Sequence, residues 1–184
     1  MFHARIKAHT RDAHAALERK LMQRISRIEN RVDYAALLVV LYSYYSSVEN
    51  AVFPFASEGI TDYDKRRKAS RLRDDVKTLM PHVESFPSCT VVPTINSFYG
   101  ALGALYVTEG STLGGVIISR IISSKLQSQE GFSFFTCYGD NVQVMWNNFK
   151  TYLQGPFTTA HEAEILDSAR ETFLTFNQWL SAHD

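Results

Sequence analysis

The chain has 184 residues, of which 45% are hydrophobic and 21% charged, a balance typical of one globular domain and not of a disordered polypeptide. Lysine plus arginine and aspartate plus glutamate number 19 each, so no net charge favours nucleic acid or an anionic membrane. We therefore expect a single domain over residues 1–184 that does not bind nucleic acid.

Neither export nor membrane insertion is indicated. The sequence starts at Met1 without a basic segment followed by an apolar one, and its longest apolar runs, 34–45 and 113–122, are shorter than the roughly 20 residues that cross a bilayer. Cys89 and Cys137 lie far apart and suit reduced thiols. These features predict a cytoplasmic protein without a membrane span.

Apolar residues recur at helical spacing along most of the chain, and no segment alternates as a strand would. Pro54 and Pro81 are expected to end the second and third helices, and Thr158 or Thr159 to cap the last. The predicted helices cover residues 2–22, 31–53, 62–80, 94–126, 141–153 and 159–180. The fold class is all-α, a packed array of six or seven helices with loops near 81–93 and 128–138.

Glycines line one face of the helix predicted near residue 110. At 100° per residue, Gly100, Gly103, Gly110 and Gly114 fall within a stripe about 80° wide. Each interior glycine costs a helix about 0.5–1 kcal/mol relative to alanine, so four on one face indicate a close neighbour. That neighbour is either another helix or a flat ligand resting on the backbone. Gly115 lies off the stripe and, with Gly114, marks a place where the helix can bend.

The first helix carries candidate ligand residues. His9 and His14 are about 140° apart around the helix, which does not suit a zinc pair. A single neutral imidazole is enough to bind one axial position of haem iron, and His14 lies beside small apolar residues. Lys7 and Arg11 share a face with His14, where cations can pair with haem propionates; the alternative for both is a solvated charged face.

Two of these helices together resemble those of haem oxygenases. The first contains T-R-D-A-H-A-A-L-E at residues 10–18, similar to the family's proximal pattern T-x-x-x-H-x-x-L-E. The glycine-lined helix contains A-L-Y-V-T-E-G-S-T-L-G-G at 104–115, which resembles the distal helix, especially the bacterial form E-G-S-x-L-G-G. Residues 169–180, A-R-E-T-F-L-T-F-N-Q-W-L, look like the family's last conserved helix. The resemblance extends over essentially the whole chain.

The resemblance implies a haem held between the first helix and the glycine-lined helix, with His14 as the axial ligand of the iron. The residues that it places against haem, besides His14, are Lys7 and Arg11 near the propionates, Gly110, Gly114 and Gly115 on the distal face, and Phe173 and Phe176 on the pocket wall. Phe176 equally suits plain core packing. Gly110, Ser111 and Gly114 would be the residues closest to the chemistry.

The implied reaction uses haem as both substrate and cofactor, with O2, and yields biliverdin, carbon monoxide and free iron. Electrons would come from a separate reductase, a ferredoxin-like donor or a chemical reductant, because nothing in the sequence resembles a flavin or nicotinamide site. A bilin acceptor protein would be a further partner.

The sequence departs from the animal members of this family at several positions. Ser111 stands where they carry an aspartate that orders distal water, so proton delivery requires another group. Their propionate-binding basic residues of the later helix are replaced by W-N-N at 146–148, with Lys150 one turn away. His9 is a second ligand candidate, although its helix face argues against it.

Three other functions are compatible with such a chain. The first is a haem-binding or sensing protein without turnover, and the second an unrelated activity on the same scaffold, such as a thiaminase-like or quinone-cofactor-forming enzyme. The third is a helical interaction module in which the glycine stripe serves close packing. No cysteine nucleophile beside a base supports the second.

Overall fold

The computed structural model describes residues 2–183, which contain α-helices and short 3-10 turns but no strand. The α-helices are α1 (Phe2–Ser26), α2 (Arg31–Gly59), α3 (Ser70–Leu79), α4 (Phe98–Gly110), α5 (Thr112–Leu126), α6 (Val142–Thr151) and α7 (Thr159–Ser181). The 3-10 turns are η1 (Tyr63–Lys65) and η2 (Gly139–Asn141). The all-α prediction is confirmed.

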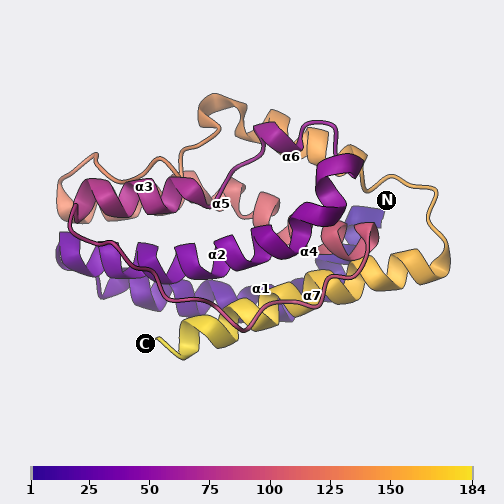
Figure 1. Cartoon of the computed structure of the whole chain (residues 1–184), viewed down its shortest axis with the longest axis horizontal. Coiled ribbons are helices and arrows are strands. Elements are labelled where there is room, and N and C mark those ends of the chain that lie inside the picture. Colours follow the sequence, from indigo (N-terminus) through magenta and orange to yellow (C-terminus); the bar gives the residue numbers. More distant parts are fainter. Residues whose placement is uncertain (1, 184) are drawn as a thin grey trace.

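The long helices α1, α2 and α7 lie along the longest axis of the molecule, with the two termini at opposite ends (Figure 1). α7 packs extensively against both α1 and α4, and α2 packs against α3 and α4. The core lies among these helices, where Ile6, Leu38, Ala101 and Ile165 are fully buried. α7 therefore fixes the position of α1 relative to α4.

α4 and α7 approach closely because of the first two glycines of the stripe. A Cβ atom at Gly103 would lie 2.5 Å from the carbonyl oxygen of Ile165 and 2.9 Å from the amide nitrogen of Ala169. The Ser168 hydroxyl donates to the carbonyl of Gly100 at 2.7 Å. This half of the stripe serves helix packing.

The prediction that Pro54 ends the second helix is wrong. α2 continues to Gly59 because Val52 and Ala56, on either side of the proline, are fully buried and hold the helix in the core. A proline removes one helical hydrogen bond and bends the helix without necessarily ending it. Figure 1 shows α2 bending in its last turns, the part that contains Pro54.

The helix predicted over residues 62–80 is also shorter than expected. α3 begins at Ser70, after the 3-10 turn η1 and an irregular segment. The Glu49 carboxylate of α2 accepts a hydrogen bond from the amide of Ala69 at 2.7 Å, and Arg66 turns inward with 4% of its surface exposed. Long-range contacts therefore hold this segment out of the helix that its local pattern favours.

α4 and α5 together are long and apolar enough to cross a membrane by length and composition. An 18-residue window within Phe98–Leu126 has a mean hydropathy of 1.3, and half of that window is buried inside the protein. A core helix of a folded domain passes the same test, so the absence of a membrane span stays a prediction.

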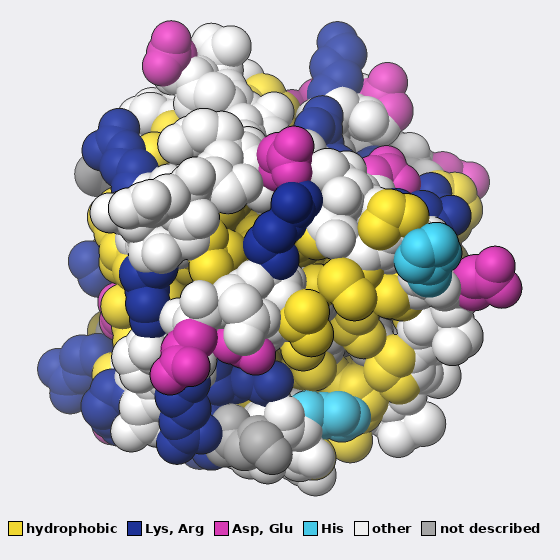
Figure 2. All heavy atoms as spheres, turned by 90° about the vertical axis from the view of Figure 1, so that its left-hand side faces the viewer, with side chains coloured by type: hydrophobic (Ala, Val, Ile, Leu, Met, Phe, Trp, Pro, Cys, Tyr) yellow, Lys and Arg dark blue, Asp and Glu magenta, His cyan; other side chains and the backbone are white. Residues whose placement is uncertain are grey.

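Charge is unevenly distributed over the surface despite the balanced total. Figure 2 shows the end of the molecule at which α1 and α5 finish. Most of the Lys and Arg side chains on this face gather on one half, and a hydrophobic patch lies on the other. The net charge of zero predicts no electrostatic steering of a partner. Any such steering therefore depends on the local distribution of charged side chains on the surface.

Candidate functional site

His14 lies at the edge of the buried face of α1. That face is defined by Ile6, Thr10 and Leu17. At 100° per residue, His14 falls about 60° from their mean direction. Its ring packs against Phe173 of α7, with centroids 5.0 Å apart, yet the residue is solvent-exposed. The imidazole is therefore supported on one side and accessible to a ligand.

The other candidate residues of α1 are exposed. Lys7 has no ion pair among the described residues, and Arg11 lies 3.4 Å from Asp12 in a surface pair. His9 Nε2 lies 3.7 Å from a carboxylate oxygen of Asp167 on α7. The propionate contacts of Lys7 and Arg11 stay predictions.

The distal segment is interrupted at Ser111, between α4 and α5. The carbonyl oxygen of Thr108 accepts hydrogen bonds from the Ser111 hydroxyl, at 2.7 Å, and from the Arg67 guanidinium. These donors compete with the amide of Thr112, from which Thr108 would accept in a continuous helix. The Thr112 hydroxyl itself donates to the carbonyl of Glu109 at 2.6 Å. Side chains thus create the break.

The three distal glycines have different surroundings. A Cβ atom at Gly110 would lie 3.4 Å from Trp146 of α6, and one at Gly115 would lie 2.7 Å from the carbonyl oxygen of Phe135. A Cβ atom at Gly114 would meet nothing within 4 Å. The helix is interrupted at Ser111, whereas Gly114 and Gly115 lie inside α5. Gly114 is the glycine of the three that borders open space.

α1 and α5 are joined near their C-terminal ends by Lys125. Its ammonium group donates to the carbonyl oxygens of Ile25, at 3.2 Å, and Ser26, at 2.6 Å. Eleven residues separate His14 from Ile25 and eleven separate Gly114 from Lys125. At 1.5 Å per residue, both lie about 16 Å from this junction along their helices. Because the two helices run in the same direction (Figure 1), His14 and Gly114 are level with each other.

The surface around Gly114 combines open space with an exposed apolar side chain. Ile117, one turn further along α5 and on the same side, is apolar and 60% exposed. Within the described residues α1 packs extensively on α7 and has no comparable contact with α4 or α5. Exposed apolar residues beside a bare backbone mark a binding surface. With the accessible imidazole of His14, they suit haem.

The two predicted wall residues of α7 differ in role. Phe173 is buried and supports His14. Phe176 stacks on Tyr44 of α2, with ring centroids 4.3 Å apart, and meets Tyr45 edge-on at 5.5 Å. Phe176 is therefore part of the aromatic core, and through Tyr45 it supports the distal side.

Tyr45 and Arg67 converge on Ser111 from outside the distal helix. The Arg67 guanidinium donates to the Ser111 hydroxyl oxygen at 2.7 Å, and the Tyr45 hydroxyl lies 3.0 Å from the same oxygen. Because the single proton of Ser111 is donated to Thr108, Tyr45 is the donor to Ser111. The Ser111 oxygen thus has its proton and both lone pairs engaged.

A second arginine forms a buried ion-pair network behind the break. The side chain of Arg66 is 2% exposed and donates to Glu109 at 3.1 Å, to Asp62 at 2.7 Å and to the carbonyl of Met145 at 2.9 Å. Burial by itself lowers the pKa of Arg66, but the nearby carboxylates of Glu109 and Asp62 raise it above its ordinary value. Tyr138 also donates to Glu109, at 3.0 Å, and burial raises its pKa. This network holds α4 and α6 to η1.

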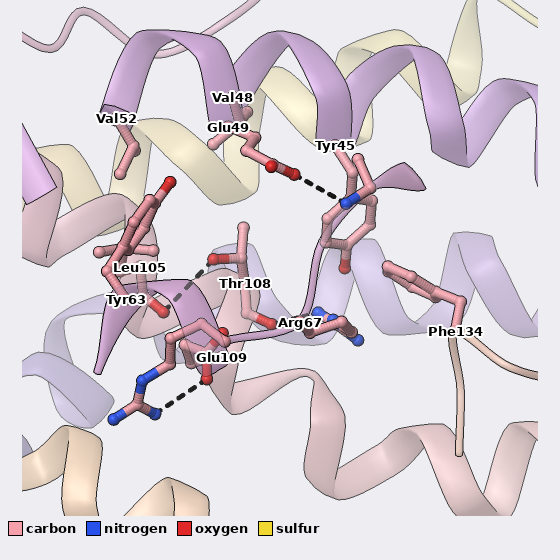
Figure 3. Close-up of a pocket in the computed structure, with 12 residues that line it drawn as sticks. Tyr45, Val48, Glu49, Val52, Tyr63, Arg67, Leu105, Thr108, Glu109 and Phe134 are labelled. Atoms are coloured by element: carbon pink, nitrogen blue, oxygen red, sulfur yellow. Dashed lines mark hydrogen bonds and ion pairs between the residues drawn. The ribbon is translucent and has the colours of Figure 1, made fainter. Parts of the chain in front are cut away.

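A small cavity of about 30 Å³ lies between α2, α4 and the segment around Arg67. Figure 3 shows Tyr45 pointing from α2 toward Arg67, with Phe134 beside it, and the two rings meet edge-on with centroids 5.0 Å apart. Thr108 and Glu49 also line the cavity. A polar cavity of this volume can hold a water molecule.

Residues 146–148 of α6 stand where animal members of the haem oxygenase family carry propionate-binding basic residues, and in this protein Trp146 serves packing. Trp146 stacks on Phe149, with centroids 5.8 Å apart, and covers Gly110. Asn147 is exposed and accepts a hydrogen bond from Gln143. No group of three or more His, Cys, Asp or Glu side chains among residues 2–183 could hold a metal ion. Cys89 and Cys137 are free thiols.

Tyr45, Arg66 and Arg67 were not predicted from the sequence as site residues. The run K-R-R-K at 65–68 resembles a solvated charged face, and Tyr45 belongs to an apolar helix face. The spacing of Asp62 and Arg66 at i and i+4 is the one local signal of an ion pair here.

The profile of the Heme oxygenase family matches residues 68–182 of this chain. The chain belongs to the haem oxygenase family. It is 30% identical over 121 residues to "Heme oxygenase" of Xanthomonas campestris pv. campestris, covering 64% of this chain and 69% of that protein. Its fold is similar to that of "Heme Oxygenase from Leptospira interrogans", with a TM-score of 0.77, 18% identity and 98% of each chain covered.

The haem oxygenase profile covers the distal break and α7 but begins after α1, so it does not include His14. The assignment of His14 as the iron ligand rests on its motif and on its position level with Gly114. Haem binding is implied by the family.

Proposed function

We propose that this protein is a haem oxygenase that cleaves haem with O2 and external electrons to biliverdin, carbon monoxide and ferrous iron. The proposal is supported most directly by His14 and Gly114, which lie level with each other on two helices that Lys125 joins. Membership of the family adds that haem is the expected ligand.

The residues of this chain would contact haem on two opposite faces. His14 would ligate the iron from α1, with Phe173 limiting the tilt of its ring. Gly114 would let the backbone of α5 approach the opposite face, where a larger side chain would exclude the ligand. Lys7 and Arg11 would pair with the propionates at the solvent edge. Bound haem supplies the iron at which O2 is reduced and the ring that is cleaved.

Electron supply is expected from a separate protein or a chemical reductant. A reductase or a ferredoxin-like donor would deliver electrons one at a time to the haem complex, and a bilin acceptor would remove the product. The reaction is proposed to take place in the cytoplasm.

The proposal is tested by adding hemin to the purified protein and recording the visible spectrum, then adding O2 and a reductant. A Soret band of a histidine-ligated haem that decays into a biliverdin spectrum supports it. A band that persists favours a haem-binding protein without turnover, and no band would refute both.

His14→Ala is expected to abolish the histidine-ligated spectrum while leaving far-UV circular dichroism unchanged, because the residue is exposed and the one aromatic ring that its imidazole meets among residues 2–183 is that of Phe173. His9→Ala is the matched control on the same helix and should retain the spectrum. The opposite pattern would make His9 the ligand.

A further inference from the structure

Arg67 is held in place from several sides. Its guanidinium lies 4.1 Å from the ring centroid of Phe134 and 5.1 Å from that of Tyr45, an arrangement that fixes its plane. Its own amide donates to the Tyr138 hydroxyl at 2.6 Å. The guanidinium then reaches Thr108 and Ser111 at the break of the distal helix.

The two polar acceptors of this guanidinium are uncharged. Arg66, the preceding residue, is neutralised by Asp62 and Glu109, whereas Arg67 makes no ion pair among the described residues. A half-buried cation without a carboxylate partner exerts its field on its surroundings, and here it contacts the Thr108 carbonyl and the Ser111 hydroxyl.

The other charged groups around this place are already engaged. The Glu49 carboxylate on α2 is bound to the amide of Ala69, and Glu109 on α4 is bound to Arg66 and Tyr138. Arg67 lines the same small cavity as these two residues but forms an ion pair with neither of them. Arg67 is thus the cation with the most direct contact to the distal segment.

We propose that Arg67 is a positioning residue of the distal site, which fixes the Ser111 hydroxyl and directs positive charge toward the face of α5 that would bind haem. This inference rests on the proposed function. Arg67 uses one lone pair of Ser111, and Tyr45 must then donate to the other, so the lone pairs of the Tyr45 oxygen stay available. A water in the cavity would donate to that oxygen and connect the distal site to the interior.

The test compares Arg67→Met, which removes the charge, with Arg67→Lys, which keeps it. Arg71→Met on the exposed face of α3 is the matched control. For each protein we would measure haem affinity, the rate of haem decay under single turnover, the pH midpoint of the ferric haem spectrum, and Tm without haem.

Removing a nearby cation disfavours deprotonation on the distal face, so Arg67→Met should raise the pH midpoint by about 0.5–1 unit. Its haem decay should slow by about 10-fold or more, the range expected for loss of a group that orders proton transfer. Haem affinity should change by less than about 3-fold, because the contact to haem is indirect. Arg67→Lys should restore the midpoint, and Arg71→Met should match the wild type.

Ser111→Ala gives a second test, by comparison of the single variants with the double variant. If Arg67 acts through Ser111, adding Arg67→Met to Ser111→Ala should slow haem decay no further than about 2-fold. A lowered Tm with unchanged decay rate and pH midpoint in Arg67→Met would show a merely structural role and overturn the inference. Failure of the wild-type protein to convert haem would instead refute the proposed function.

Discussion

The glycines of α4 and α5 have different roles in this protein, and the atoms nearest to each glycine decide its role. Gly103 allows α7 to approach, Gly110 and Gly115 accept Trp146 and Phe135, and Gly114 faces open space. The last of these is the position at which a side chain would cost the haem-free protein nothing.

Gly114→Leu should therefore separate ligand binding from stability. We expect the haem-free protein to keep or slightly raise its free energy of unfolding, by up to about 1 kcal/mol, because glycine is the poorer helix former. Haem affinity should fall at least about 10-fold, measured by Soret titration, because the side chain would occupy the proposed haem face.

Gly103→Ala is the matched control for this substitution. Its Cβ atom would overlap the backbone of α7, so overpacking should lower the free energy of unfolding by about 1–3 kcal/mol. Retention of full haem affinity in Gly114→Leu would make the whole stripe a packing feature.

Arg66 and Arg67 are neighbours in sequence but depend on different partners. Arg66→Ala would leave the Glu109 carboxylate buried, with 4% of its side chain exposed, and without its cation. We expect a loss of about 3–5 kcal/mol in the free energy of unfolding, measured by urea denaturation. Arg73→Ala breaks a pair with Asp74 that is largely exposed and should change stability by less than about 0.5 kcal/mol. Equal effects would contradict the buried network.

Helix ends in this fold are set by specific side-chain acceptors. Asn30 caps α2, Ser97 caps α4, and Thr158 caps α7 by accepting from the amide of His161 at 3.2 Å. The His161 ring completes the capping box, where the sequence had suggested Glu162 opposite Thr159. α7 depends on this cap because its first turn is largely exposed.

Thr158→Ala should lower the free energy of unfolding by about 1 kcal/mol, since an orphan amide at the start of α7 would lose its acceptor. Thr159→Ala, one residue later, should change it by less than about 0.5 kcal/mol. Thermal unfolding of the two variants side by side measures the difference. A larger loss for Thr159→Ala would place the cap there.

Helix breaks in this fold depend on contacts between distant parts of the chain. α4 and α5 separate at Ser111 because Arg67, 44 residues away, competes for the Thr108 carbonyl. α3 begins late because Glu49 of α2 holds the amide of Ala69. The distal segment therefore owes its shape to α2 and the segment before α3 as much as to its own glycines.

Across the whole molecule, buried tyrosines of α2 bind the loop at Gly131 and helix α7. Tyr34 donates to the carbonyl of Gly131 at 2.6 Å and Tyr44 to that of Thr172 at 2.7 Å. Burial raises the pKa of both phenols, raises that of Tyr138, and raises the pKa of Tyr63 to about 12. The folded protein therefore keeps these groups neutral.

Alkaline pH should consequently destabilise the fold. In the unfolded chain tyrosine ionises near pH 10, so below about pH 10 the contribution of these groups is fully present. Above it the unfolded state loses protons that the folded state retains, and the free energy of unfolding falls as pH rises toward and beyond 12. Urea unfolding between pH 8 and 12 measures this slope.

Tyr63→Phe should make that slope shallower by up to about 1.4 kcal/mol per pH unit, the contribution of one such group. The substitution should change the free energy of unfolding little at pH 7, because the Tyr63 hydroxyl makes no hydrogen bond to another of residues 2–183. An unchanged slope would show that Tyr63 ionises normally.

Local sequence was sufficient for the fold class, and it supplies His14 and Gly114 as the predicted haem-site residues. Apolar periodicity predicts most helices, and the motifs around His14 and Gly114 lie on α1 and α5, the two helices that Lys125 joins. Both depend on residues within a few positions of one another, for which helix geometry alone fixes the spacing.

Tertiary structure alone decided the rest. α2 passes through Pro54 because buried neighbours hold it, and Ser111 meets Tyr45 and Arg67 across 66 and 44 residues of chain. Such contacts depend on how α2, α4 and the segment before α3 pack, which no local pattern encodes. For the same reason the glycine stripe, one feature in the sequence, divides in the structure between helix packing and a proposed haem face.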